Sequence, residues 1–186
     1  MSTERGRVLT RLARASIARA LGEAVDEPPH PDWLEAPGAV FVTLTRGGEL
    51  RGCIGSLQAR RSLEEDVVEN ARMAAFGDPR FPPLNRSELD DTRVEVSVLS
   101  TAEPIAFTDE ADALSKLRPG IDGVILEWGR HRATFLPQVW QQLPEPRDFL
   151  AHLKRKAGLP ADFWDDGVRL YRYTVEKYVE DEHARA

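Results

Sequence analysis

Cysteine is almost absent from this sequence, since Cys53 is the only one among 186 residues. A single thiol excludes an intramolecular disulfide and a metal site built from several cysteines. Long apolar runs are also missing, and no segment reaches the roughly 20 residues that a membrane-spanning helix needs. The 25 basic and 31 acidic residues give a formal net charge of −6, without the basic field of a DNA-coating protein. We therefore expect a cytoplasmic protein whose partners are neither membranes nor nucleic acids.

Metal and cofactor motifs are missing as well. No two histidines stand at a metal-ligand spacing, and none has such a spacing to Cys53. The four lie isolated along the chain at His30, His131, His152 and His183. The Gly47-Gly48 pair lies between two expected strands and not before a helix, so it is no phosphate-binding loop. We expect no bound metal and no cofactor.

The N-terminal segment over residues 5–21 is rich in arginine and has two interpretations. Its composition is that of an organelle transit peptide. Its apolar residues, among them Leu9 and Ile17, repeat at helical spacing. We favour a structural amphipathic helix over residues 7–22, which the proline-rich run 26–31 ends.

The remaining chain predicts the same order of elements twice. Alternating β-branched residues indicate strands, glycine pairs indicate tight turns, and a Ser62–Glu65 capping box starts a helix. The first set is a hairpin of residues 39–45 and 50–56, a helix through Phe76 with Gly77 as its C′ residue, and a strand over 92–99. The second set is a short helix over 110–117 capped by Thr108, a hairpin of 124–127 and 132–136, a helix from Pro146 to Ala157, and a last strand over 168–178.

This repetition predicts the α+β class. Few helices against antiparallel strands indicate a two-layer sandwich built from two hairpin–helix–strand halves with antiparallel sheets. No linker is long enough to free one half from the other. We expect a single domain over residues 5–180, with halves of about 37–100 and 101–180 and the N-terminal helix packed on them.

The stretch Leu50–Gly55 (LRGCIG) is the first candidate site. Strict alternation places Arg51, Cys53 and Gly55 on one face of a strand, and Leu50, Gly52 and Ile54 on the other. Glycine weakens a strand unless something approaches closely, so Gly52 and Gly55 predict an open backbone surface around a thiol. The Arg51 guanidinium would favour the thiolate. The alternative is a buried cysteine that acts as a small hydrophobe.

Three further residues, in two segments, are candidates for substrate contact. Pro79 keeps Asp78 out of the helical region, and the planar fork of Arg80 matches a carboxylate or a phosphate. The alternative is a turn that ends a helix and carries a surface Asp78–Arg80 contact. Thr134, in the hairpin of the second half, offers a hydroxyl, although the nearby Pro137 explains much of that segment as the end of an edge strand.

The sequence resembles the AMMECR-type domain family, also labelled protein A of the AmmeMemoRadiSam system. Besides LRGCIG, the resemblance rests on residues 41–44 (FVTL), 70–71 (NA), 74–76 (AAF), 78–81 (DPRF), 95–99 (EVSVL), 120–123 (GIDG), 133–137 (ATFLP), 139–140 (VW) and 156–158 (KAG). These segments cover nearly the whole chain. The resemblance implies two interlocked α+β halves and an N-terminal helix that belongs to the domain.

The resemblance also implies partners, but no reaction. In bacteria and archaea the family is associated with a Memo-like protein, similar to extradiol dioxygenases, and with a radical SAM protein. It also implies that the loop of Asp78 and Arg80 lies near Cys53. We therefore expect an enzyme or enzyme component that acts on a small or peptidic substrate around Cys53. The alternative is a non-enzymatic module that presents the same surface to a partner protein.

Overall fold

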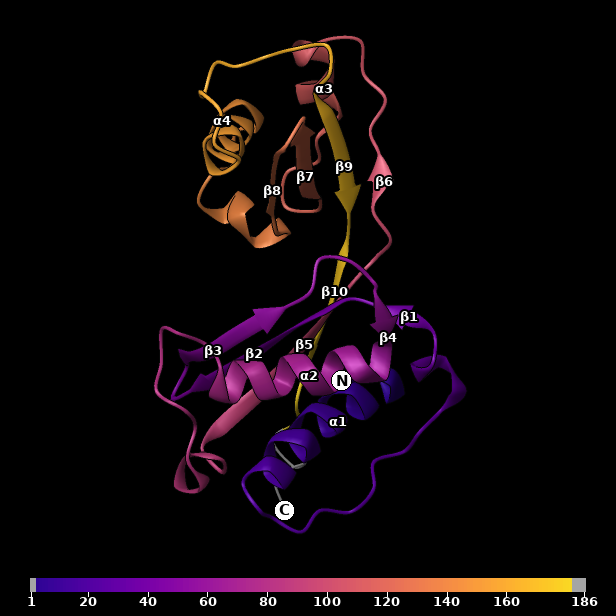
Figure 1. Ribbon diagram of the computed structural model, residues 1–186, viewed down its shortest axis with the longest axis vertical. Coiled ribbons are helices and arrows are strands. Elements are labelled where there is room, and N and C mark those ends of the chain that lie inside the picture. The colour runs from indigo at the N-terminus through magenta and orange to yellow at the C-terminus, as the bar shows by residue number, and fades with distance from the viewer. Residues whose placement is uncertain (1–2, 182–186) are drawn as a thin grey trace. The chain divides into compact units, whose positions relative to one another are not determined.

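The computed structural model describes residues 3–181, which form two compact units (Figure 1). The first unit comprises the chain up to Leu99 together with the segment from Glu176 onward, and the second comprises Ser100–Val175. Each unit holds one four-stranded sheet with its helices. The expected α+β class with antiparallel sheets is confirmed.

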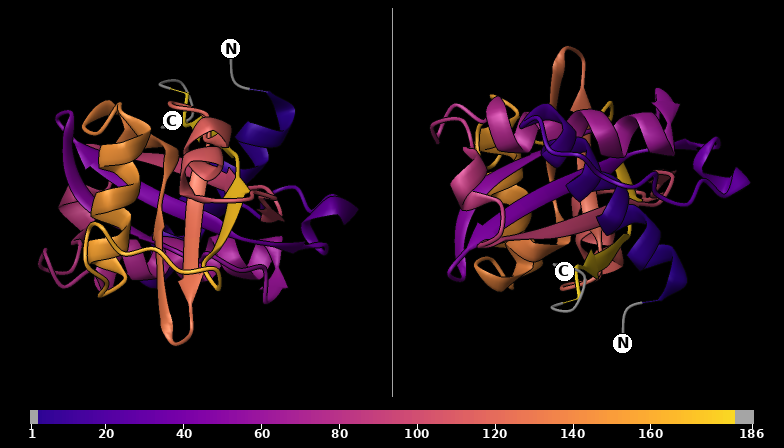
Figure 2. Two further views of the ribbon diagram at one scale, coloured as in Figure 1. Left: turned by 90° about the horizontal axis from the view of Figure 1, so that it is seen from above. Right: turned by 90° about the horizontal axis from the view of Figure 1, so that it is seen from below.

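In the first unit, two helices cover one face of a sheet in the order β10-β5-β2-β3 (Figure 2). The elements are α1 (Glu4–Ala20), β2 (Val40–Arg46), β3 (Glu49–Gly55), α2 (Leu63–Phe76), β5 (Thr92–Leu99) and β10 (Val175–Val179). The short pieces are η1 (Asp32–Leu34), β1 (Pro37–Gly38) paired with β4 (Arg61–Ser62), and η2 (Arg86–Glu88).

The second unit repeats this plan with a sheet in the order β6-β9-β7-β8. Its elements are β6 (Glu103–Pro104), α3 (Glu110–Lys116), β7 (Gly123–Trp128), β8 (His131–Phe135), η3 (Pro137–Gln141), α4 (Pro146–Lys156) and β9 (Arg169–Tyr173). In both units a helix, a hairpin, a second helix and a strand follow one another. The expected duplication of hairpin, helix and strand is therefore confirmed.

Local signals account for most of these elements. The Ser62 hydroxyl accepts from Glu65 N and the Glu65 carboxylate accepts from Ser62 N, so the predicted capping box starts α2. The N-terminal segment forms the predicted amphipathic helix, with Leu9 and Ile17 fully buried. Its Arg14 guanidinium bonds the buried Glu180 carboxylate, which ties α1 to the end of the C-terminal strand. Because of this burial and this ion pair, the N-terminal segment is a structural helix of the first unit.

Three expectations about elements were wrong. The predicted strand over 168–178 is divided at Thr174 into β9 and β10, which belong to different sheets. Asp109, not Thr108, caps α3, because its carboxylate accepts from Asp112 N at 2.8 Å. Gly77 is the C-cap of α2 and not a C′ residue, and its φ of −120° needs no left-handed conformation.

Candidate functional site

Cys53 lies on β3, which is an edge strand of the first sheet. It is partly exposed and stands directly opposite Thr43 of β2. The two side chains share one face of the sheet, and the Cys53 Sγ lies 3.2 Å from the Thr43 Oγ1. An uninterrupted register from the Gly47-Gly48 turn would place Val42 opposite Cys53, so Thr43 could not be expected there without the one-residue shift in the pairing of β2 and β3.

The backbone of Cys53 is held by an ion pair from the loop after α2. The Asp78 Oδ2 accepts from Cys53 N at 2.9 Å, and the Arg80 Nη2 donates to Cys53 O at 3.3 Å. Arg80 also donates to Asp78 from Nε at 3.0 Å and from Nη2 at 2.7 Å. The pair therefore satisfies backbone groups that an edge strand leaves open. The expected proximity of this loop to Cys53 is confirmed.

The charge state of Asp78 follows from these contacts. Its carboxylate is buried, and burial alone would raise its pKa. The hydrogen bonds from the Arg80 side chain, with further bonds from the backbone N–H groups of Cys53 and Arg80, instead hold the pKa of Asp78 far below its ordinary value. The same contact raises the pKa of Arg80. Asp78 is thus a permanent hydrogen-bond acceptor at neutral pH.

Arg51 has a carboxylate partner that the sequence pattern did not indicate. Its Nε and Nη2 each lie 3.0 Å from an oxygen of Glu88, in a bidentate pair. This guanidinium is the main reason why the pKa of Glu88 is lowered. Arg51 is 9% exposed, and its Nη1 is buried without a hydrogen-bond partner among the described residues. Its guanidinium carbon lies 6.0 Å from the centre of the Phe81 ring.

A β-bulge at Arg51 interrupts the alternation of side chains along β3. Thr45 pairs with Leu50 and Leu44 pairs with Gly52, so Arg51 is the extra residue of β3. The expectation of strict alternation was therefore wrong across this residue. Because paired residues share a face, Leu50 lies with Thr45 and Cys53 and not with Gly52.

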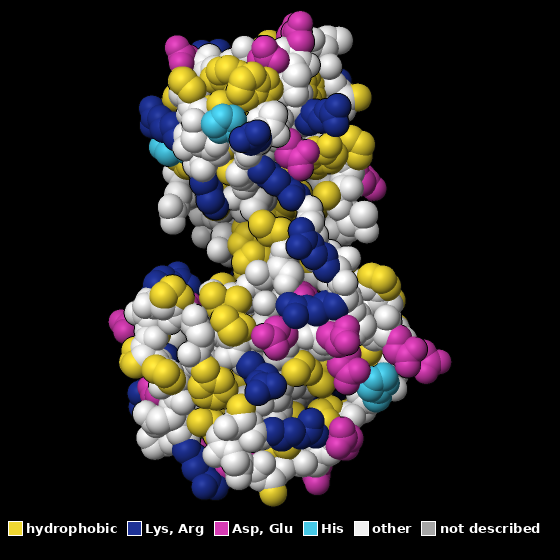
Figure 3. Space-filling view, viewed as in Figure 1, with side chains coloured by type: hydrophobic (Ala, Val, Ile, Leu, Met, Phe, Trp, Pro, Cys, Tyr) yellow, Lys and Arg dark blue, Asp and Glu magenta, His cyan; other side chains and the backbone are white. Residues whose placement is uncertain are grey.

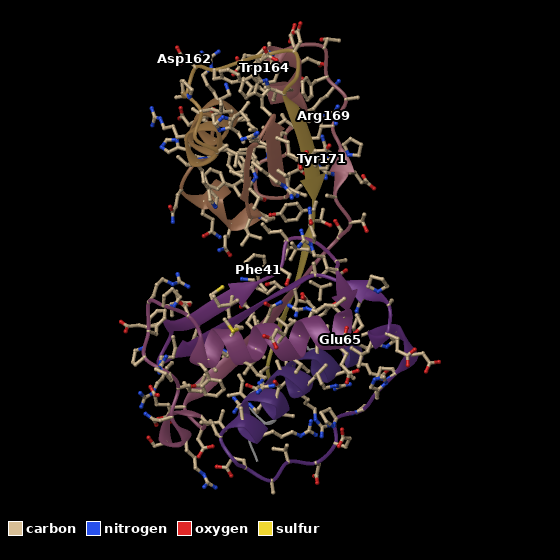
Figure 4. The ribbon with its side chains drawn as sticks, viewed as in Figure 1. Phe41, Glu65, Asp162, Trp164, Arg169 and Tyr171 are labelled. Atoms are coloured by element: carbon tan, nitrogen blue, oxygen red, sulfur yellow. The ribbon has the colours of Figure 1, made fainter. Side chains whose placement is uncertain are left out.

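The expected open surface beside the two glycines is also wrong. A Cβ on Gly52 would lie 2.0 Å from the Ala74 carbonyl oxygen, so Gly52 lets the α2 backbone approach β3 closely. A Cβ on Gly55 would lie 2.3 Å from the ring of Phe41, the residue labelled on β2 in Figure 4. The glycines accommodate neighbouring groups of the protein itself, and the exposed part of the site is the Cys53 side chain with its surroundings.

Polar groups continue across the sheet from Cys53. Glu95 of β5 pairs with Thr43, and its carboxylate lies 3.1 Å from the Lys177 ammonium group. Thiol, hydroxyl, carboxylate and ammonium thus follow one another on the face of the sheet opposite the helices. Glu95 is partly exposed on this face.

Thr134 belongs to the second unit, whereas the six other candidate residues lie in the first. Its hydroxyl donates to Val124 O at 3.0 Å and lies 3.0 Å from the Tyr173 hydroxyl. Its carbonyl accepts from the Lys156 ammonium group at 2.9 Å. Burial raises the pKa of Tyr173. The polar groups of Thr134 are therefore engaged within its own hairpin and its neighbours.

Residues 3–181 contain neither a metal-binding cluster nor a membrane-spanning helix. No three His, Cys, Asp or Glu side chains gather there in a way that could hold a metal ion. Among the helices of this described part, none is both long and apolar enough to cross a membrane.

Comparison with known proteins identifies the relatives of the chain. A model of the AMMECR1 family matches residues 10–178. A protein of Methanothermobacter thermautotrophicus is 42% identical, with 97% of each chain covered. A protein of Methanocaldococcus jannaschii is 38% identical over 98% of this chain and 93% of its own length. The crystal structure of the uncharacterised protein PH0010 from Pyrococcus horikoshii has a TM-score of 0.82 and 38% identity, and covers 97% of this chain and 94% of that one.

Proposed function

The chain belongs to the AMMECR1 family, and from the contacts around its thiol we propose that it is an enzyme, or a component of one, acting on a small or peptidic substrate at Cys53. The observation that carries the proposal is the Asp78–Arg80 pair, which binds both backbone groups of Cys53. This pair fixes the strand at Cys53 while the thiol stays partly exposed beside the Thr43 hydroxyl. Catalysis requires that the reacting group be held in a fixed geometry, and surrounding hydrogen bonds supply this here.

Each neighbour of the thiol has a role in this proposal. The Thr43 hydroxyl lies 3.2 Å from the sulfur, a hydrogen bond in which either atom can be the donor, and it holds the thiol in place. The Arg80 side chain is 54% exposed, so it can bind an anionic group of the substrate while it stays on Asp78. Arg51 is committed to Glu88 and its unpartnered Nη1 is buried, so its role is to hold β3 against η2 and not to contact a substrate.

A second function uses the same surface without chemistry. Leu50 is 42% exposed on the Cys53 face, and Phe81 lies beside Arg51 and Arg80. Such residues suit a protein-binding module, with a Memo-like or a radical SAM protein as partner in an AmmeMemoRadiSam system. Trp140 is buried and stacks on Phe149, so it is not available to a partner. We place either function in the cytoplasm, where a free thiol stays reduced.

Alkylation of the native protein tests the reactive thiol. We expect iodoacetamide to modify native Cys53 within about tenfold of the rate for the urea-unfolded chain, because Cys53 is partly exposed and its sulfur is hydrogen-bonded. Thr43→Val keeps the side-chain shape but removes the hydroxyl. It should slow the reaction at neutral pH by about fivefold, the equivalent of one ordinary hydrogen bond. Intact-mass spectrometry gives the rates.

Cys53→Ser supplies the control for folding. We expect its thermal midpoint to stay within about 2 °C of the wild-type value, because one half-exposed sulfur is exchanged for oxygen. A native thiol protected by more than about a hundredfold, or a serine variant that unfolds, would instead show that Cys53 is a packing residue.

A parallel capture experiment separates the two functions. Wild type and Cys53→Ala are immobilised, exposed to cell extract, and analysed for retained metabolites and proteins. Small molecules retained by the wild type alone support an enzyme. Proteins retained equally by both support the binding module and would contradict catalysis at Cys53.

A further inference from the structure

A cleft of about 720 Å³ lies between α3 and α4 in the second unit. The corresponding hollow between α1 and α2 in the first unit has about 330 Å³. The helices that flank the two hollows also differ in length, since α1 has 17 residues whereas α3 has only 7. A volume of this size is typical of small-molecule sites, which span roughly 300–1,000 Å³.

The cleft has an apolar lining that its surroundings hold in place. Leu114 of α3, Ala151 of α4 and Trp164, labelled in Figure 4, contribute to it. The Trp164 ring lies 5.5 Å from the Phe107 ring and 5.5 Å from the Lys154 ammonium group. Lys154 is fully buried and bonds Glu110 at 2.5 Å, so this ion pair links α4 to α3. The lining is therefore anchored independently of any ligand.

The rim of the cleft carries mostly negative charge. Four acidic residues line it, namely Asp109, Glu110, Asp148 and Asp162, against the single basic residue Arg147. Acidic side chains also border an apolar patch at the α3 end of this unit in Figure 3. Glu110 is neutralised by the buried ammonium group behind it, which leaves an excess of two carboxylates.

Two of these carboxylates are available to a ligand. Asp148 and Asp162 are exposed, and their carboxylates have no ion-pair or hydrogen-bond partner within residues 3–181. The acidic residues surround the opening without converging as a metal-binding group in that part of the chain. This arrangement favours an organic cation over a metal ion, because the charges face a volume much larger than one ion.

We propose that this cleft binds a small organic amine with an aromatic body, a ligand site separate from the one around Cys53. The ammonium group of the ligand faces Asp148 and Asp162, and its body packs against Trp164 and Leu114. Charge complementarity selects the amine, and the apolar lining selects the aromatic body.

Calorimetric titration of the full chain tests the proposal with two matched probes. Tryptamine carries an indole and an ammonium group, whereas indole-3-propionate carries the same ring and a carboxylate. We expect tryptamine to bind at least about tenfold more tightly than indole-3-propionate, because the rim repels the anion. Comparable affinities for the two probes, or no measurable binding of tryptamine, would overturn the proposal.

Substitutions at the rim assign the binding to this cleft. The double variant Asp148→Asn and Asp162→Asn removes both free carboxylates and should weaken tryptamine binding about tenfold, with an unchanged thermal midpoint. Asp166→Asn is the matched control, since Asp166 is exposed nearby but does not line the cleft. An undiminished affinity in the double variant would refute the site, as would an equal loss in Asp166→Asn. Binding of pentalysine without binding of tryptamine would point to a basic peptide and also overturn the proposal.

Discussion

Gly52→Ala is expected to lower the free energy of unfolding by about 3 kcal/mol, as overpacking of a closely packed position does. The new Cβ would lie 2.0 Å from the Ala74 carbonyl oxygen and 3.0 Å from its carbon. Both are backbone atoms of α2, so relief requires the helix to move away from β3. Chemical denaturation followed by circular dichroism measures the change.

The same substitution at Gly77 is the matched control. There the new Cβ would meet the Met73 methyl group at 2.5 Å, the flexible end of a side chain that is 40% exposed. Because Met73 can move into solvent, Gly77→Ala should cost less than about 1 kcal/mol. Equal effects of the two substitutions would contradict a close approach of α2 at Gly52. Since Gly52 precedes Cys53, we also expect Gly52→Ala to alter the alkylation rate of the thiol.

Asp78→Asn is expected to lower the free energy of unfolding by about 2 kcal/mol at pH 7. This is the usual contribution of a hydrogen bond to a charged group. The amide retains an acceptor for Cys53 N but loses the charge that holds Arg80. Because Arg80 is half-exposed, its side chain can then turn into solvent, and this limits the loss of stability. Urea denaturation at several pH values gives the free energies.

The pH dependence of this difference has a defined sign. The pKa of Asp78 in the folded protein lies below its value in the unfolded chain, so the unfolded chain binds the proton first. The carboxylate therefore contributes its full stabilisation above the ordinary aspartate pKa of 3.8. The contribution declines as the pH falls below that value, and the wild type and Asp78→Asn should converge in acid.

Asp90→Asn provides the control for Asp78. Asp90 is exposed, and its carboxylate has no partner among the described residues. Its substitution should change the stability by less than about 0.5 kcal/mol. A constant difference between wild type and Asp78→Asn from pH 7 into acid would show that the Asp78 carboxylate is not selectively stabilised in the folded protein.

Much of the candidate site was predictable because Cys53 lies in a short strand with recognisable neighbours. The strand of Cys53 agrees with the structure, and so does the proximity of the Asp78–Arg80 loop, which the family resemblance implied. The Asp78–Arg80 contact was the alternative interpretation of that loop, and the structure contains it with Asp78 buried. The partner of Arg51 was not predictable, because Glu88 lies 37 residues further along the chain. Nor did the pattern show the bulge, which depends on how β3 pairs with β2.

The elements that could be predicted from the sequence alone are those whose signals are local. A capping box, alternating side chains and glycine turns act through atoms a few residues apart, so α2, both hairpins and β5 were expected where they occur. Which groups far apart in the chain meet became visible only in the folded protein. It closed the space beside Gly52 with the backbone of α2 and divided the last predicted strand at Thr174 between two sheets. Such outcomes depend on the packing of whole elements, which local backbone preferences do not encode.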